Sequence, residues 1–269
     1  MLENFIANLS QWLLSISEGS TTWVAFYAGL FVAIMTSLGA LVAIFAKSIP
    51  EKGVDFSLSF AAGVMIVASF TSLILPAIES TGSFSPAGIG IALGVLLIYA
   101  IDRLLPHEHL VKGYEGPRSM KERLRKVWLL VIAVIIHNLP EGLAVGTSIV
   151  YNLEVGLVTA IAIGIQDFPE GTVVSLPLAT LQKKRLQPIV IGILSGFAEM
   201  VMVIIGAYFF TAFEWLLPYG LGLAGGAMLY VTIKEMIPEI YRREESETLV
   251  TLGFFAGFYV MLFLDSMLG

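Results

Sequence analysis

Long apolar runs separated by short polar segments set the pattern of this chain. Each run is long enough for an α-helix to cross a bilayer, which takes about 20 residues. The runs lack the alternation of barrel strands, and backbone amides in hydrocarbon must pair within their own segment, so the pattern favours helices. The runs cover residues 22–46, 56–78, 86–105, 127–150, 153–181, 188–213, 217–240 and 248–268. We therefore predict an all-α integral membrane protein with eight transmembrane helices, in a single polytopic domain over residues 1–269.

The composition supports this prediction and limits the chemistry. Hydrophobic residues make up 57% of the chain and charged residues 13%, and the mean hydropathy is +0.87. The lipid bilayer is therefore the expected partner, and nucleic acid is not. Because the chain has no cysteine, disulfides and thiolate metal sites are excluded. Any metal must bind through nitrogen, oxygen or thioether sulfur.

The positions of Lys and Arg predict the orientation. With eight crossings, all 15 of these residues fall on one side, which the positive-inside rule makes cytoplasmic. Both termini then lie outside the cytoplasm, and residues 106–126 form the longest cytoplasmic loop. Residues 1–18 lack the basic start of a signal peptide and carry apolar residues at helical spacing. They predict either a short amphipathic helix on the outer surface or a frayed end.

Small residues four positions apart recur in four of the predicted helices and would let helix backbones approach closely. These pairs are Gly90 and Gly94, Gly142 and Gly146, Gly192 and Gly196, and Gly253 and Gly257. They predict close packing of helices and do not by themselves indicate a binding or catalytic site.

A polar motif occurs twice in the apolar background. "HNLPEG" at 137–142 is matched by "QDFPEG" at 166–171. Both copies lie near the middle of predicted helices that run in opposite directions, as in transporters whose site is at the membrane midplane. Residues four apart share a helix face, so His137 lies over Glu141, and Gln166 over Glu170. Each copy also carries a proline, which releases the carbonyl four residues earlier.

The carboxylates of these motifs indicate a metal. One carboxylate at the bilayer centre costs roughly 2.5 to 3.5 kcal/mol on insertion scales. Glu141, Asp167 and Glu170 could not all stay ionised in one apolar pocket without a cation or protons. Imidazole, carboxylate and amide oxygen suit zinc, iron(II), manganese or cadmium better than copper(I). The alternative is a satisfied hydrogen-bond network between two helices, but a structural network has no need of two copies of a motif whose proline should kink its helix.

Two further residues lie at the same predicted depth. Glu199 is either another carboxylate of the site or a lone glutamate that is protonated or bonded to serine. Met65 is either core filler or a thioether ligand. "AAGVM" at 61–65 is echoed by "AGGAM" at 224–228, each in a helix that later carries a proline, which hints at an inverted repeat.

These motifs resemble the ZIP family of divalent metal transporters, and "QDFPEG" is similar to its bacterial GufA-type branch. The resemblance covers nearly the whole chain and implies a 3+2+3 inverted-repeat arrangement around a two-metal centre, in a bacterial inner membrane. It implies a first metal position formed by Met65, His137, Glu141, Gln166 and Glu170. It implies a second position formed by Asn138, Glu141, Asp167, Glu170 and Glu199. Zn²⁺ is the expected cargo, Cd²⁺, Fe²⁺ and Mn²⁺ are left open, and so is a homodimer.

A second group of polar residues lies toward the predicted cytoplasmic side. His107 and His109 follow the third apolar run, and three acidic residues lie at the same predicted end. They form either an exit route for metal or a solvated loop in which Asp102 pairs with Arg103. The full set of candidate exit ligands is Asp102, His107, His109, Glu235 and Glu239.

We therefore predict a transporter that takes up divalent metal cations, foremost zinc, into the cytoplasm. No glycine-rich phosphate loop with lysine is found, so no nucleotide is expected. The alternative is an intramembrane metal-dependent hydrolase, which would also need a metal, a glutamate and a polar cleft. Its usual helical signature, HExxH, is missing, so we do not predict an enzyme.

Overall fold

The computed structural model describes residues 2–45, 51–104, 107–109, 113–115, 122–182, 185–241 and 246–268, and nearly all of them are helical. Two short strands, β1 (His107–His109) and β2 (Gly113–Glu115), pair antiparallel. The helices in chain order are α1 (Leu2–Ile16), α2 (Thr21–Phe45), α3 (Glu51–Ala68), η1 (Ser69–Ile74), α4 (Leu75–Glu79), α5 (Phe84–Leu104), α6 (Glu122–Tyr151), α7 (Leu153–Gln182), α8 (Leu186–Ala212), η2 (Glu214–Leu216), α9 (Leu217–Val231), η3 (Thr232–Met236), α10 (Ile237–Ile240) and α11 (Glu247–Leu268).

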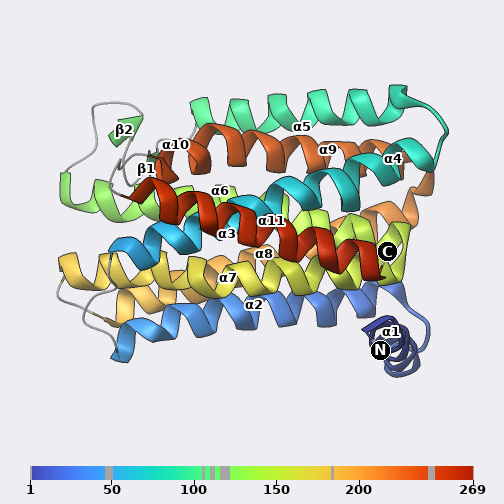
Figure 1. Ribbon diagram of the computed structural model, residues 1–269, viewed down its shortest axis with the longest axis horizontal. Helices are drawn as coiled ribbons and strands as arrows, with labels where there is room; N and C mark the ends of the chain where they lie inside the picture. The colour runs from blue at the N-terminus through green and yellow to red at the C-terminus, as the bar shows by residue number, and fades with distance from the viewer. Residues whose placement is uncertain are drawn as a thin grey trace.

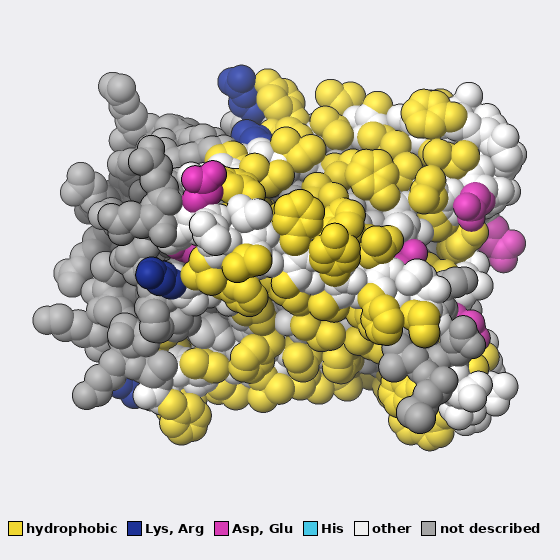
Figure 2. Space-filling view, in the orientation of Figure 1, with side chains coloured by type: hydrophobic (Ala, Val, Ile, Leu, Met, Phe, Trp, Pro, Cys, Tyr) yellow, Lys and Arg dark blue, Asp and Glu magenta, His cyan; other side chains and the backbone are white. Residues whose placement is uncertain are grey.

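Much of this helical bundle is apolar enough to lie in a membrane. Within the described residues, six helical stretches are long and apolar enough to cross a bilayer, namely Thr21–Phe45, Asp55–Glu79, Phe84–Ile101, Leu186–Ala212, Glu214–Met236 and Glu247–Met267. Hydrophobic side chains cover the middle of the face shown in Figure 2. The protein is therefore an integral membrane protein of the all-α class, as its hydropathy predicted. The two polar motifs lie in α6 and α7, which have 30 residues each.

The long helices run side by side along the long axis of the molecule (Figure 1). Helix α1 and the C-terminal end of α11 lie at one end, and the β1–β2 pair lies at the other. Helix α2 packs against α7 and α8, α6 packs against the same two helices, α5 packs against α9, and α3 packs against α11. Contacts of α6 with α9 and of α3 with α7 join these groups. The motif helices are therefore surrounded by other helices.

The predicted close approaches at paired glycines are confirmed. A Cβ added at any of the eight glycines named above would come within 2.9 Å of an atom on a neighbouring helix. At Gly94 in α5, that Cβ would lie 2.1 Å from the carbonyl oxygen of Leu223 in α9. Since real side chains do not tolerate such distances, only glycine allows these backbones to come so close.

The two helices with echoing sequences share a local irregularity. Four residues after Met65, α3 changes to the π-helix η1, and four residues after Met228, α9 changes to the π-helix η3. The hydroxyls of Ser69 and Thr232, the first residue of each π-helix, donate to the carbonyls of Met65 and Met228. Each π-helix is followed by a short helix with a proline near its start. Single π-helical turns of this kind are common at functional sites.

The N-terminal segment is helical, and one of its faces packs on the bundle. Ile6 and Leu13 are buried in the main core, whereas Phe5 and Trp12 are exposed. A helix with one apolar side open is suited to a membrane surface. Its position on the outer surface stays a prediction.

Candidate metal centre

Three carboxylates from the two motifs meet in the interior of the bundle. Glu141 from α6 and Asp167 and Glu170 from α7 each offer an oxygen, and these three oxygens lie within 4.8 Å of one another. Glu141 and Asp167 are only 1% exposed. Two oxygens bound to the same zinc ion are at most about 4.4 Å apart, because zinc–oxygen bonds are 2.0–2.2 Å long. A small contraction of this cluster would therefore bring all three oxygens onto one cation.

Two amide side chains donate hydrogen bonds to carboxylates on neighbouring helices. Asn138 Nδ2 in α6 donates to Glu199 Oε2 in α8 at 3.1 Å. Gln166 Nε2 in α7 donates to Glu141 Oε1 in α6. Within the described part of the chain, Asn138 Oδ1 and Gln166 Oε1 have no hydrogen-bond partner. Since an amide oxygen is an acceptor, both are free to bind a cation.

Several carboxylate oxygens of the site also lack a hydrogen-bond partner within the described residues. Among the described residues, the following carboxylate oxygens are buried without a hydrogen-bond partner: Glu141 Oε2, Asp167 Oδ1 and Oδ2, Glu170 Oε2 and Glu199 Oε1. A buried polar atom without a partner costs about 1 to 3 kcal/mol, and more if it is charged. A satisfied hydrogen-bond network, the alternative considered from the sequence, would not leave so many acceptors open. The arrangement instead provides oxygens for a positive ion.

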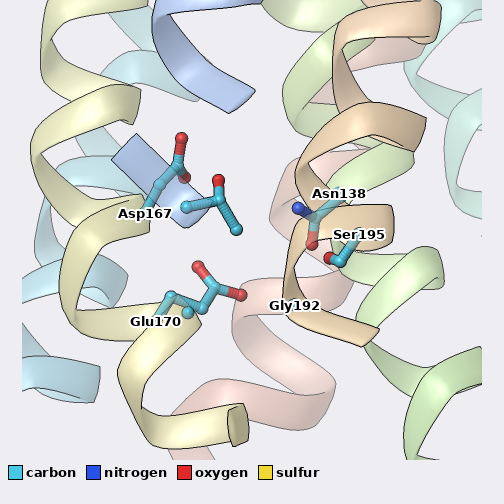
Figure 3. A pocket seen from close by; sticks show the side chains of 7 residues that line it. Asn138, Asp167, Glu170, Gly192 and Ser195 are labelled. Atoms are coloured by element: carbon cyan, nitrogen blue, oxygen red, sulfur yellow. The ribbon is translucent and has the colours of Figure 1, made fainter. Parts of the chain in front are cut away.

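A pocket opens beside these carboxylates. Figure 3 shows Asp167 and Glu170 on one side of it and Asn138 and Ser195 on the other. The lining residues are Thr36, Asn138, Asp167, Glu170, Gly171, Gly192 and Ser195. Thr36 and Ser195 were not among the residues predicted from the sequence. The position of Ser195 could have indicated a role, because it lies one helical turn before Glu199 on the same face of α8, whereas nothing in the local sequence singles out Thr36.

The remaining two candidate ligands of the first position contact helix η3. His137 Nε2 lies 3.1 Å from Glu235 Oε2. Met65 in α3 is 1% exposed, and its sulfur lies 3.7 Å from Thr232 Oγ1. The sequence grouped Glu235 with the histidines of the cytoplasmic loop, but the structure places this buried residue beside a motif histidine. The π-helix thus contributes to the surroundings of the site.

The other candidate exit ligands can be located only by their backbone. His107 and His109 are the first and last residues of β1, Asp102 lies in α5 and Glu239 in α10. The side chains of all four lie outside the described residues, so their part in an exit route stays a prediction.

The final glycine of each motif positions the carboxylates. A Cβ at Gly142 would lie 2.4 Å from the carbonyl oxygen of Glu199 in α8, and a Cβ at Gly171 would lie 2.2 Å from that of Thr36 in α2. Each "PEG" therefore ends in glycine where its helix is pressed against another helix. This contact fixes the preceding glutamate relative to the neighbouring helix.

The chain is similar to proteins that are named as zinc transporters. Residues 112–265 match the family model of the ZIP zinc transporters. The chain is 40% identical to zinc transporter ZIPB of Bordetella bronchiseptica over 243 residues, which cover 87% of this chain and 78% of that protein. It is 36% identical to zinc transporter GufA of Myxococcus xanthus, with 90% and 98% covered, and 29% identical to human zinc transporter ZIP11, with 93% and 98% covered. The chain therefore belongs to the ZIP family.

Proposed function

We propose that the protein moves divalent metal cations, with zinc as its main cargo, across the membrane through the centre formed by α6, α7 and α8. The observation that carries this proposal is the cluster of Glu141, Asp167 and Glu170 inside an apolar helical bundle. Negative charge at this depth is costly unless a cation compensates for it. The relatives named zinc transporters support zinc in particular. Cadmium, iron(II) and manganese are further candidate cargoes.

The candidate ligands divide into two chemically different positions. The first would combine the His137 imidazole and the Met65 thioether with oxygens of Gln166 and two glutamates. The second would use only oxygens, from Asn138, Asp167, Glu199 and the same two glutamates. Glu141 and Glu170 would bridge the two positions. The open amide and carboxylate oxygens described above support this assignment.

The chain functions as a transporter and not as an enzyme. The hydrolase considered from the sequence finds no support among the relatives, which are named as zinc transporters. The buried ligands and the apolar helices around them suit the passage of an ion between two aqueous sides.

We further propose eight crossings, formed by the six apolar stretches together with α6 and α7. At 30 residues each, α6 and α7 would be about 45 Å long, enough to cross the hydrocarbon core. The paired π-helices in the two echoing segments support a 3+2+3 inverted repeat. The Lys and Arg side chains visible in Figure 2 lie toward the end opposite the termini, which supports an orientation with both termini outside the cytoplasm. Uptake into the cytoplasm across a bacterial inner membrane is part of the same proposal.

Metal flux into liposomes tests the proposed function. The purified protein would be reconstituted with a zinc-sensitive dye inside, and protein-free liposomes would serve as the control. We expect zinc-dependent fluorescence only with protein present. Competing cadmium, iron(II) or manganese outside would show which other ions share the pathway. An absence of flux with folded protein would refute the proposal.

Replacement of Asp167 by asparagine should weaken metal binding at one of the two proposed positions only. Asp167→Asn removes charge from the second position and leaves every proposed ligand of the first in place. We expect one of the two metal-binding steps in calorimetry to lose roughly tenfold in affinity, while the other step is unchanged. Weakening of both steps would contradict a role of Asp167 in the second position alone.

Acidification should slow metal uptake. Carboxylates and imidazole must be deprotonated to bind a cation, so protons compete with the metal for the same atoms. The competing groups are Glu141, Asp167, Glu170 and Glu199, with His137 and its partner Glu235 beside them. Initial rates of zinc uptake, measured with equal pH on both sides of the liposome, should fall steadily from pH 7.5 to 5.5. A rate independent of pH over this range would contradict protonatable ligands.

A further inference from the structure

Ser195 is a buried hydroxyl with an unusual environment. Most buried serines and threonines in the described helices donate to the carbonyl four residues earlier, a common way to satisfy a hydroxyl in an apolar helix. Examples are Thr36 to Val32, Ser69 to Met65, Thr147 to Leu143, Ser175 to Gly171 and Thr232 to Met228. Ser195 is 2% exposed, yet within the described part of the chain its Oγ has no hydrogen-bond partner. Its hydroxyl therefore has an unused lone pair and proton.

The packing of α8 directs this hydroxyl to the pocket. Glycines precede and follow Ser195 in "GILSG" at 192–196. A Cβ at Gly192 would lie 2.5 Å from Ala40 Cβ, and one at Gly196 would lie 2.9 Å from Thr36 Cβ. The two glycines thus press this turn of α8 against α2, and Ser195 lines the pocket together with Asn138 (Figure 3).

We propose that the Ser195 hydroxyl is a further oxygen ligand of the divalent cation at the second position, an inference that rests on the proposed function. The hydroxyl shares a pocket with Asn138, Asp167 and Glu170 and a helix face with Glu199. A neutral hydroxyl completes an all-oxygen ligand set without adding negative charge to a crowded group of carboxylates. Hard oxygen ligands favour harder cations such as manganese over softer ones such as cadmium. Ser195 would therefore add to the preference of this position for harder cations.

Replacement by cysteine gives a direct test, because the chain has no other thiol. With cadmium chloride added to the purified protein in detergent, Ser195→Cys should show the ultraviolet charge-transfer absorption of a cadmium–thiolate bond. Its cadmium affinity relative to zinc should rise roughly tenfold over the parent protein, since a soft ligand replaces a hard one. The absorption should disappear in Ser195→Cys combined with Asp167→Ala, which removes a ligand of the same position.

Ser72 provides a matched control. It is fully buried, and among the described residues its hydroxyl also has no hydrogen-bond partner. Its carbonyl accepts from Ser148, which lies ten residues, or about 15 Å, along α6 from Asn138. Ser72→Cys should show no cadmium–thiolate absorption. Ser72→Ala should bind metal as the parent does, whereas Ser195→Ala should lose roughly tenfold in the same zinc-binding step that Asp167→Asn weakens.

The outcomes separate this inference from the function on which it rests. If the parent and Ser195→Cys both bind cadmium and the variant shows no thiolate absorption, the Ser195 assignment is overturned while the transport proposal stands. Unchanged zinc affinity in Ser195→Ala would overturn it as well. If the folded parent binds no divalent cation, the proposed function fails, and the Ser195 assignment fails with it.

Discussion

Alanine at Glu141 or at Glu170 should abolish metal uptake. Each carboxylate would bridge two metal positions, so its loss removes charge and a ligand from both. Both side chains have an oxygen that is buried without a partner in the described residues, and both belong to the carboxylate cluster. Water is a poor substitute at this depth, because it brings no negative charge. We expect a reduction of at least about a hundredfold in initial zinc uptake, if each lost charged ligand costs roughly 3 kcal/mol of binding.

The measurement compares liposomes that carry equal amounts of folded protein. Glu141→Gln and Glu170→Gln remove the negative charge but keep nearly the same side-chain shape. Both variants should be nearly as inactive as the alanine variants, because the lost charge is what matters. Glu154 at the start of α7 offers a control, because it is exposed, and Glu154→Ala should keep normal uptake. Wild-type uptake by either Glu141→Ala or Glu170→Ala would disprove the bridging role.

Adding one methyl group at Gly142 should have the second largest effect. The Cβ of Gly142→Ala would lie 2.4 Å from the carbonyl oxygen of Glu199 and 2.8 Å from Met202 Cβ. Because the obstructing atoms include helix backbone, α8 must move away from α6, and Glu199 would move with it. Overpacking of this kind costs about 1 to 3 kcal/mol, which corresponds to roughly 5 °C in Tm for a protein of this size. We expect that loss of stability together with loss of most zinc uptake.

Gly206 is the matched control for this prediction, because it lies on the same interface between α6 and α8. A Cβ there would have its nearest contact, 3.1 Å, with the end of the flexible Leu143 side chain. Gly206→Ala should therefore shift Tm only slightly and retain uptake. Thermal unfolding in detergent and liposome flux measure both variants. Equal stability of Gly142→Ala and Gly206→Ala would show that the close approach at Gly142 is not required.

The sequence by itself determined the helices and the chemistry at their centre. Hydrocarbon leaves a backbone no partner outside its own segment, so an apolar run of sufficient length becomes a helix wherever it occurs. For this reason the run at 153–181 corresponds closely to α7, Leu153–Gln182. The sequence also indicated which residues within each motif share a helix face, because residues four apart do so whatever lies around them.

Only the tertiary structure decided which groups meet across helices. The pairing of His137 with Glu235 depends on how α6 lies against the π-helix η3. The pocket position of Ser195 depends on the close contact of α8 with α2. Helix packing in a membrane is driven by shape and small residues rather than by a hydrophobic pattern. The sequence therefore names the residues that can pack closely, but the partner of each helix follows only from the fit of all the helices together.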